Sequence, residues 1–362
     1  MTTSTHSKKF KSRTSRWRVA KVSALWLALP LIFAVSMRGD TRDTSLYIEI
    51  FQSITEFPKN PIDYYAEFGV EWGFGILSWL LGSLQFGPTS LFFFVSAATF
   101  FFIERTANSI RMSFYTVMPY YLGSFFLTQQ LMQIRQGLGV AFAFWVLVRF
   151  TLQPNGPLKL LSGAIAALFI HMVAVVPLAG ALVVRRFLPT PDRKRIVCWV
   201  LILIFVTVTF ARAISPSQFL GLFERLTLYS TDGEYSAPRS LFDPANVRAL
   251  FILLIITSAT AVRSLAQSRI FLLLLGLYAM HVGIRLGFVD FQILSGRLST
   301  ALGFAEVFLL PMTVNACVPS NTKRTFLGLL YFLVHGFATL AFQAPFLIND
   351  YFTPLSIDYP TR

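Results

Sequence analysis

Charged residues are scarce in this sequence. Asp, Glu, Lys and Arg make up only 13% of its 362 residues, whereas 55% are hydrophobic and the mean hydropathy is +0.62. Soluble domains carry about 25% charged residues. The deficit therefore excludes a water-soluble multidomain protein and indicates an integral membrane protein.

Cysteine is rarer still. Cys198 and Cys317 both lie in or beside apolar segments, with no CxxC or His/Cys spacing. Neither a disulfide framework nor a zinc site is expected. The sequence also lacks a Walker motif, a dinucleotide-binding glycine fingerprint, HExxH and GxSxG. These absences argue against nucleotide-driven work and zinc hydrolysis, and we predict neither a cofactor nor a metal.

Acidic residues are outnumbered, 17 against 31 Lys and Arg, which gives a net charge of +14. The basic residues stand mostly in short clusters between apolar runs, and seven of them fall in the first 21 residues. This arrangement is typical of the positive-inside rule, which orients membrane spans. It requires no nucleic-acid partner.

The apolar runs predict an all-α polytopic membrane protein with about eleven transmembrane helices, within a range of roughly 10–12. Residues 1–21 form a basic cytoplasmic tail, and residues 22–343 form one multi-span domain. Segments 38–71 and 214–246 carry more acids than bases and are expected to be outer loops. The tail 344–362 is expected on the same outer side.

Two points of topology stay open from the sequence. Residues 158–184 suit either one tilted helix or two half-spans that meet near His171. A strict count puts the turn at 129–136 inside, whereas splitting 158–184 and merging 72–103 puts it outside. Periodicity does not decide, because buried spans are apolar all round. The pattern LYIEIFQSI at 46–54 suits a helix lying along the membrane interface.

Segment 129–150 places Arg135 and Gln136 among residues that are otherwise apolar. A cation at bilayer depth costs roughly 2.5–3.5 kcal/mol, so it must face protein, water or an anion. Arg135 is therefore a candidate for binding an anionic ligand. The other charged or titratable residues in or next to spans are Glu71, His171, Arg285, Asp290, Arg297 and Glu306.

Arg285 and Arg297 flank one short connection, with Asp290 between them. Two converging guanidiniums make a good clamp for a phosphate or diphosphate, because the planar fork bonds oxyanions bidentately. An Arg–Asp pair with one snorkelling arginine explains the same pattern.

His171 lies in the middle of an apolar run. It is either a hydrogen-bonding core residue or a general base that takes a proton from a sugar hydroxyl. The outer segments mix carboxylates, arginines and aromatics, which suits carbohydrate but is also the composition of an ordinary ordered loop. The residues predicted to bind glycan are Arg42, Tyr47, Gln136, Tyr235 and Asp290.

Taken in order, several short motifs resemble the EpsG-type branch of bacterial exopolysaccharide and O-antigen (Wzy-like) polymerases. They are RDTSLYIEIF with Arg42, Asp43 and Tyr47; EWGFGILSWLLGSL with Glu71, Gly73 and Phe74; IRQGLGVAFAF with Ile134, Arg135, Gln136 and Ala141; FIHMVAVVPL with His171; and GRLSTALGFAEVFLLP with Arg297 and Glu306. Gly139 stands where the family usually has alanine.

The resemblance implies a polymerising glycosyltransferase at the outer, periplasmic face of the bacterial inner (cytoplasmic) membrane. It would move a growing glycan from undecaprenyl diphosphate onto a hydroxyl of a new lipid-linked repeat unit, with no nucleotide sugar or metal. A chain-length regulator and a flippase are possible partners. Arg135, Arg285 and Arg297 would bind the diphosphate, and His171, Glu71 or Asp43 would be the general base. An O-antigen ligase and a flippase or transporter are the alternative readings.

Overall fold

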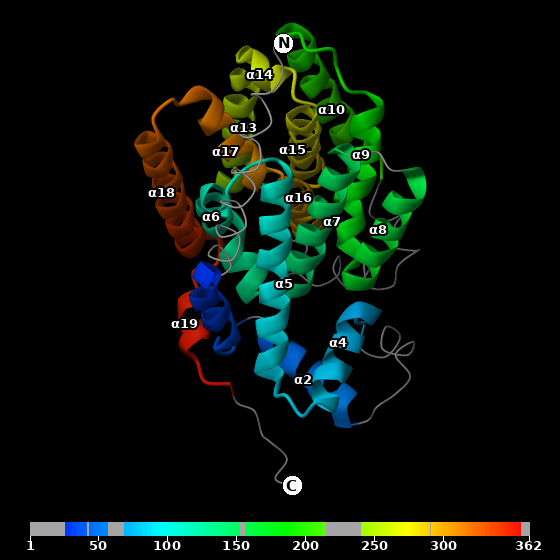
Figure 1. Cartoon of the computed structure of the whole chain (residues 1–362), viewed down its shortest axis with the longest axis vertical. Coiled ribbons are helices and arrows are strands. Elements are labelled where there is room, and N and C mark those ends of the chain that lie inside the picture. Colours follow the sequence, from blue (N-terminus) through cyan, green and yellow to red (C-terminus); the bar gives the residue numbers. More distant parts are fainter. Residues whose placement is uncertain are drawn as a thin grey trace, which may run out of the picture.

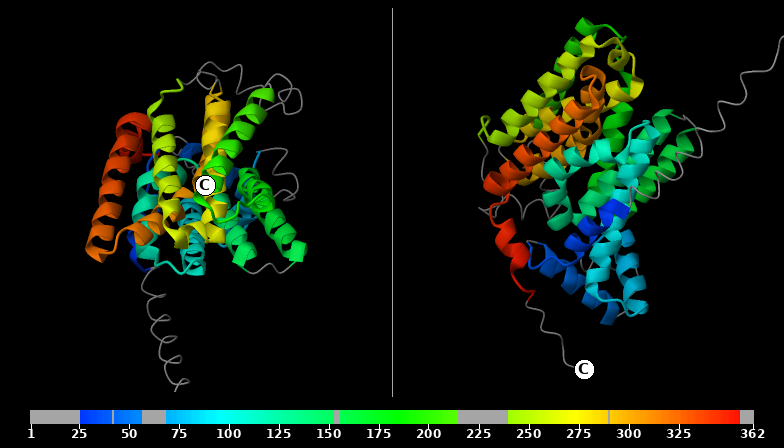
Figure 2. Two further views of the ribbon diagram at one scale, coloured as in Figure 1. Left: turned by 90° about the horizontal axis from the view of Figure 1, so that it is seen from above. Right: turned by 60° about the vertical axis from the view of Figure 1, so that its left-hand side comes forward.

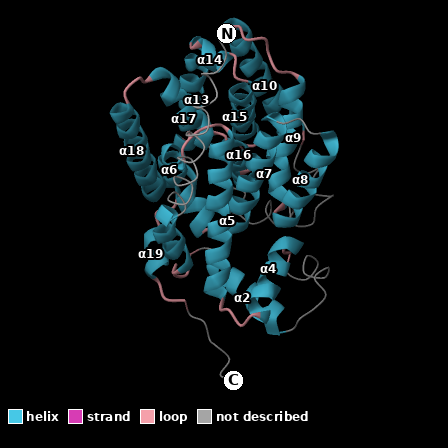
Figure 3. Ribbon diagram, viewed as in Figure 1, coloured by secondary structure: helices cyan, strands magenta, loops and turns pink. Residues whose placement is uncertain are grey.

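The computed structural model describes residues 26–41, 43–56, 69–152, 156–214, 240–289 and 291–355. Throughout these ranges the chain forms helices joined by short loops, without a strand (Figure 1, Figure 3). The predicted all-α polytopic class is confirmed.

In the first half of the chain, the described residues start with an apolar helix, Trp26–Ser36. It continues with α2 (Thr44–Glu56), α4 (Trp72–Ser83), α5 (Pro88–Ser109), α6 (Phe114–Tyr121), the π-helical η1 (Leu122–Gln130), α7 (Ile134–Leu152), α8 (Gly156–Ile170), the short η2 (Met172–Ala174) and α9 (Val175–Arg186).

The second half contains α10 (Arg193–Ala213), α13 (Pro244–Ser258), η3 (Ala259–Ala261), α14 (Arg263–Ala266), α15 (Arg269–Gly287), α16 (Gln292–Gly303), α17 (Glu306–Cys317), α18 (Asn321–Ala338), η4 (Thr339–Gln343) and α19 (Leu347–Phe352).

Seven helical segments in the described ranges are long and apolar enough to cross a membrane: 88–109, 134–152, 193–213, 244–261, 269–287, 295–317 and 321–343. Shorter apolar helices lie at Trp26–Ser36 and Leu160–Ile170. Helix α4, with 12 residues, is about 18 Å long, less than the roughly 30 Å of a bilayer core. The apolar run near 72–87 therefore supplies no full span.

Local sequence explains where several helices start. Gly87-Pro88 breaks the chain before α5, and Pro88 occupies the first turn, where its missing N–H costs nothing. Asp192 caps α10 by accepting a hydrogen bond from the Arg195 amide at 3.1 Å. Asp243 caps α13 in the same manner.

Residues 158–184 form two helices that meet at His171. The backbone of His171 is extended, with φ −165° and ψ 130°, so α8 ends there and η2 leads into α9. Of the two arrangements left open by the sequence, the pair of half-spans is the one found. With 15 and 12 residues, each helix is shorter than a bilayer core.

Helices α10 and α15 run parallel. Gly276 lies against Trp199 near their starts, and Gly287 lies against Ala211 near their ends. Figure 2 (left) shows the long helices of the second half running in about the same direction across the molecule. Both helices of the pair therefore begin on one face.

Basic side chains gather on that face. Arg185 at the end of α9 lies over the Phe150 ring at the end of α7, 4.4 Å from its centroid. Arg324 at the start of α18 donates to the Asn315 carbonyl near the end of α17 at 2.9 Å. We call this end of the molecule the basic face; it carries Arg149, Arg185, Arg186, Arg193, Lys194, Arg195, Arg263, Arg269, Lys323 and Arg324.

Away from the basic face, a second small core joins the first helices to the bundle. Tyr47 and Phe51 of α2 pack with Phe74 of α4, Phe92 of α5 and Ile134 of α7. Figure 1 shows α2, α4 and α19 at the same end of the molecule. The helix predicted at 46–54 is present within α2. This core carries the candidate site.

Candidate functional site

Glu71 joins three segments that are far apart in the sequence. Its Oε2 accepts a hydrogen bond from Arg135 Nη1 at 2.8 Å, and its Oε1 accepts one from His171 Nδ1. The amide of Met172 also points at Oε1, at 3.4 Å. We call Glu71, Arg135 and His171 the Glu71 centre.

Each member of the Glu71 centre stands at a helix end. Glu71 is the N-cap residue of α4, Arg135 is in the first turn of α7, and His171 is the extended residue between α8 and η2. Helix ends present side chains on rigid elements while leaving one side open. This placement is the usual one for a binding or catalytic group.

Two glycines allow these ends to meet. A Cβ on Gly73 would lie 2.5 Å from the carbonyl oxygen of Phe169, so α4 can touch α8 only because the side chain is absent. A Cβ on Gly139 would lie 2.9 Å from the Cβ of His171 and 3.2 Å from that of Ala174. Gly139 thus sets the distance between α7 and His171.

Burial and charge act in opposite directions on Glu71, which precedes α4 and lies outside the candidate spans. Burial alone raises the pKa of this carboxyl, but the hydrogen bond from His171 and the charge of Arg135 outweigh it and lower the pKa to about 2. Glu71 is therefore a carboxylate at neutral pH. The side chains of Arg135 and His171 keep 17% and 16% of their surface exposed, so a ligand can contact both of them.

The carboxylate also fixes the histidine tautomer. An ionised carboxylate only accepts hydrogen bonds, so His171 Nδ1 must carry the proton that it shares with Glu71. The other ring nitrogen, Nε2, is then the one that receives a proton. A carboxylate behind a histidine in this manner orients it for general-base chemistry.

Aromatic rings flank the arginine. The Arg135 guanidinium lies 5.4 Å from the centroid of Tyr47 and 5.5 Å from that of Phe74. Tyr47 is itself buried and packs on Phe74, 5.6 Å between centroids. The structure thus brings Glu71, Arg135, His171 and Tyr47 together. Asp43 lies just before α2 and accepts from the Tyr47 amide through its carbonyl.

The other predicted residues lie elsewhere or reach the centre indirectly. Gln136 is buried, and its Nε2 donates to the main-chain carbonyl of Arg297 at 3.2 Å, which ties α7 to α16. Arg285 is buried and donates through Nε to Asn246 Oδ1 on α13 at 2.9 Å. The clamp of Arg285 and Arg297 stays a prediction. Arg42, Tyr235 and Asp290 lie outside the described residues.

A second buried ionic group surrounds Glu306. The carboxylate accepts hydrogen bonds from Arg248 and Tyr331, from Ser124 at 2.9 Å, and from Tyr278 at 3.0 Å. The sequence singled out Glu306 but not Arg248, whose signal was a lone cation near the start of the apolar run at 247–262. With its oxygens satisfied from η1, α13, α15 and α18, this group holds helices together.

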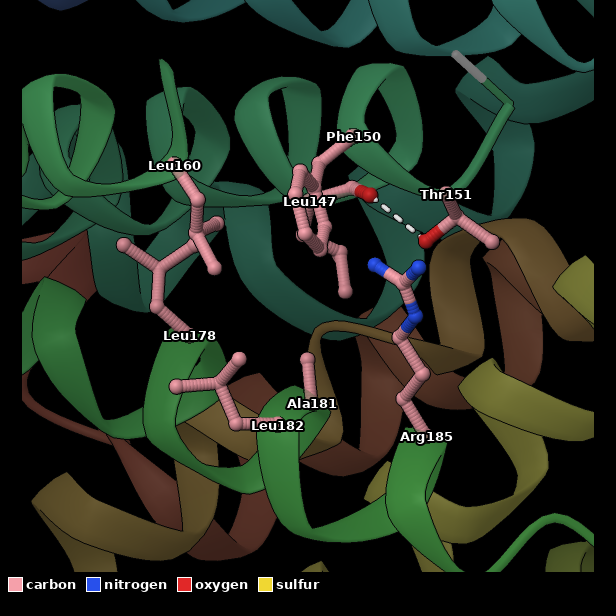
Figure 4. Close-up of a pocket in the computed structure, with 8 residues that line it drawn as sticks. All are labelled: Leu147, Phe150, Thr151, Leu160, Leu178, Ala181, Leu182 and Arg185. Atoms are coloured by element: carbon pink, nitrogen blue, oxygen red, sulfur yellow. Dashed lines mark hydrogen bonds between the residues drawn. The ribbon is translucent and has the colours of Figure 1, made fainter. Parts of the chain in front are cut away.

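An apolar pocket lies near the basic face. Its lining comes from the ends of α7 and α9 and from α8, and the Thr151 hydroxyl donates to the Leu147 carbonyl at 2.8 Å (Figure 4). Arg135 stands at the opposite end of α7. The pocket is therefore separate from the Glu71 centre and offers few polar groups to a ligand.

These features define a polytopic, all-helical membrane protein with a carboxylate, an arginine and a histidine brought together at helix ends. The model of the EpsG family matches residues 21–357, and the chain belongs to this family. Membership supports an exopolysaccharide polymerase in general terms. Neither a curated protein nor a solved structure matches the chain.

Proposed function

We propose that the protein is a polysaccharide polymerase for O-antigen or exopolysaccharide. It transfers a growing glycan from undecaprenyl diphosphate onto a hydroxyl of a new lipid-linked repeat unit, and a flippase and a chain-length regulator work beside it. The observation that carries this proposal is the bridging position of Glu71 between Arg135 and His171.

The reaction needs a base and a cation, and the Glu71 centre supplies both. The acceptor hydroxyl gives its proton to His171 Nε2 while its oxygen forms a bond to the anomeric carbon of the donor glycan. The bond between that carbon and the lipid diphosphate breaks, and the electron pair leaves with the diphosphate. Arg135 stabilises this developing negative charge, and Glu71 stabilises the imidazolium.

The charge distribution supports an outer location for the reaction. By the positive-inside rule the basic face is cytoplasmic. Helix α7 ends on that face with Arg149, so Arg135 in its first turn lies toward the opposite, periplasmic side. Lipid-linked repeat units would then reach the Glu71 centre from the outer leaflet.

The test is conversion of a purified lipid-linked repeat unit by the purified protein in lipid nanodiscs, without an energy source. The wild type is expected to produce a ladder of polymer lengths. His171→Ala is expected to produce none at an unchanged protein level, because the base is lost. Met172→Ala is the matched control: its side chain is 51% exposed and lies next to His171.

The alternatives give different products. A ligase would leave repeat units unpolymerised and attach preformed polymer to a lipid acceptor. A transporter would make no ladder and would move the lipid between leaflets. Absence of a ladder with the cognate repeat unit would refute the polymerase.

A further inference from the structure

A second buried arginine, Arg38, lies outside the Glu71 centre. It follows the helix Trp26–Ser36 and is only 2% exposed. Its Nη1 donates to the Gln130 carbonyl at 2.6 Å, and its guanidinium lies 3.6 Å from the centroid of the Phe92 ring. Burial lowers the pKa of Arg38 to about 9, so the side chain is still a cation at neutral pH.

The remaining donors of this guanidinium are unused. Nε and Nη2 of Arg38 are buried and have no hydrogen-bond partner within the described ranges. These two groups point their N–H bonds along the same edge of the guanidinium, in parallel. That edge is the fork that binds two oxygens of a phosphate or carboxylate.

The residue that accepts from Arg38 and its neighbour in the sequence also carry unused amide atoms. Gln129 is fully buried, and neither its oxygen nor its nitrogen has a partner in the described part of the chain. Gln130, whose carbonyl holds Arg38, donates through Nε2 to Tyr121 at 2.9 Å, while its Oε1 is also unpartnered. Both glutamines belong to the π-helical η1, a distortion frequent at functional sites. Buried polar groups of this kind are normally hydrogen-bonded, so these atoms leave several donors and acceptors for a polar ligand.

The group is continuous with the Glu71 centre. The Phe92 ring under Arg38 lies 6.4 Å from the Tyr47 ring, and Tyr47 lies under Arg135. Burial raises the pKa of the Tyr47 hydroxyl, and the charges of both Arg135 and Arg38 oppose that rise. One tyrosine hydroxyl is therefore within electrostatic reach of both guanidiniums.

We propose that Arg38 and Gln129 form an oxyanion subsite that takes a phosphate group of the lipid diphosphate, next to Arg135. This inference rests on the proposed function for the identity of the ligand. Arg135 and Arg38, which both act electrostatically on Tyr47, would share the two phosphates, one nearer the reacting bond and one nearer the lipid.

Entry of the anion requires the loop around Arg38 to open. The amides of Gly39 and Asp40 donate to the carbonyls of Tyr351 and Thr353 at 2.9 and 3.1 Å. Helix α19 thus fastens this loop through main-chain bonds. Val35 and Leu347 also share a small buried core beside this loop, so opening must displace that contact as well.

The direct test is binding of inorganic pyrophosphate to the full-length protein in phosphatidylcholine nanodiscs, measured by titration calorimetry. Arg38→Lys keeps the charge but loses the fork, and is expected to weaken binding at least tenfold. Gln129→Met is expected to weaken binding while raising the melting temperature, because it removes an unpartnered buried amide. Arg186→Gln, an exposed change on the basic face, should leave binding unchanged.

Several results would overturn the subsite: no binding of pyrophosphate by the wild type, or equal binding by a folded Arg38→Lys variant. Loss of pyrophosphate binding when phosphatidylglycerol is added would assign the fork to a phospholipid headgroup instead. Failure of the proposed polymerase function can be distinguished from failure of the subsite. A wild type that binds pyrophosphate through Arg38 but forms no ladder refutes the function, whereas a ladder unaffected by Arg38→Lys refutes the subsite.

Discussion

At the scale of single residues, Glu71 is the group on which the site depends. A buried carboxylate is tolerated because a guanidinium and an imidazole surround it, and each of those is in turn held by the carboxylate. Removing one partner of such a pair leaves the other charge buried and uncompensated. Substitutions at these three positions should therefore affect activity and stability together, and controls must separate the two.

Replacement of Arg135 by Lys isolates the role of the planar fork. Lysine keeps the positive charge but not the parallel donors that match an oxyanion. We expect polymer formation to fall by about 10²–10³, the loss typical of one electrostatic donor to a transition state. Initial rates of ladder formation at matched protein level measure the effect. Normal polymer length in Arg135→Lys would show that the arginine does not bind the diphosphate.

Replacement of Glu71 by Gln tests the charge of the carboxylate through pH. The folded-state pKa of Glu71, about 2, lies below its ordinary value of 4.5. Its contribution to stability is therefore fully present above pH 4.5 and is lost as the pH falls toward 2. The difference in melting temperature between wild type and Glu71→Gln should not narrow until the pH drops below about 4.5. If the difference in melting temperature disappears already above pH 5, the ion pair of Glu71 is contradicted.

At the scale of the element, the break between α8 and α9 creates the site. A continuous helix over 158–184 would leave His171 on a helix face with its main chain bonded internally. The extended backbone at His171 instead turns its ring toward Glu71 and frees the Met172 amide to face the same carboxylate. The close approach of α7 at Gly139 completes this arrangement.

A methyl group at position 139 should disturb that approach. In Gly139→Ala the new Cβ would lie 2.9 Å from the Cβ of His171, so either the turn or α7 must shift by some tenths of an ångström. We expect a roughly tenfold or greater loss of activity, since small misplacements of catalytic groups are costly. Gly336→Ala on α18 is the matched control, because a Cβ there meets only Phe332 at 3.9 Å. Equal rates for both variants would contradict the positioning role.

Individual members of the site were visible in the sequence, but their pairing was not. Arg135, Glu71 and His171 each stood out as a titratable group beside an apolar run. Glu71 is 64 residues from Arg135 and 100 from His171, and apolar spans carry no pattern that reports such contacts. The clamp of Arg285 and Arg297 rests on their nearness in sequence and stays a prediction; in the structure Arg285 also donates through Nε to Asn246 on α13.

Arg38 was missed for a related reason. It stands in the polar cluster RGDTRD, which reads as an exposed loop. Its burial results from η1, α5 and the C-terminal residues packing around the loop, and none of these is near in sequence. The helical class, by contrast, followed from composition and the length of apolar runs alone.

At the scale of the whole molecule, basic and acidic residues gather at opposite ends. The clusters of Arg and Lys at helix ends within the described residues lie on the basic face. Glu71, Asp243 and Asp350 lie away from it. Helix α8 starts on the basic face and α9 ends there. Their junction, His171, lies away from that face. Because both helices are shorter than a bilayer core, this hairpin is not counted as a full crossing. We therefore propose that the turn at 129–136 lies on the outer side.

Labelling of single cysteines tests the proposed orientation of the protein in the membrane. In a variant without Cys198 and Cys317, a cysteine at Gln133 is expected to react with a membrane-impermeant maleimide added from the periplasmic side of intact cells. A cysteine at Lys194, on the basic face, should react only after the membrane is broken. Both positions are at least partly exposed, so access to the reagent depends on the side of the membrane. The reverse pattern would put the Glu71 centre in the cytoplasm, where flipped lipid-linked repeat units cannot reach it, and the polymerase would then have to be abandoned.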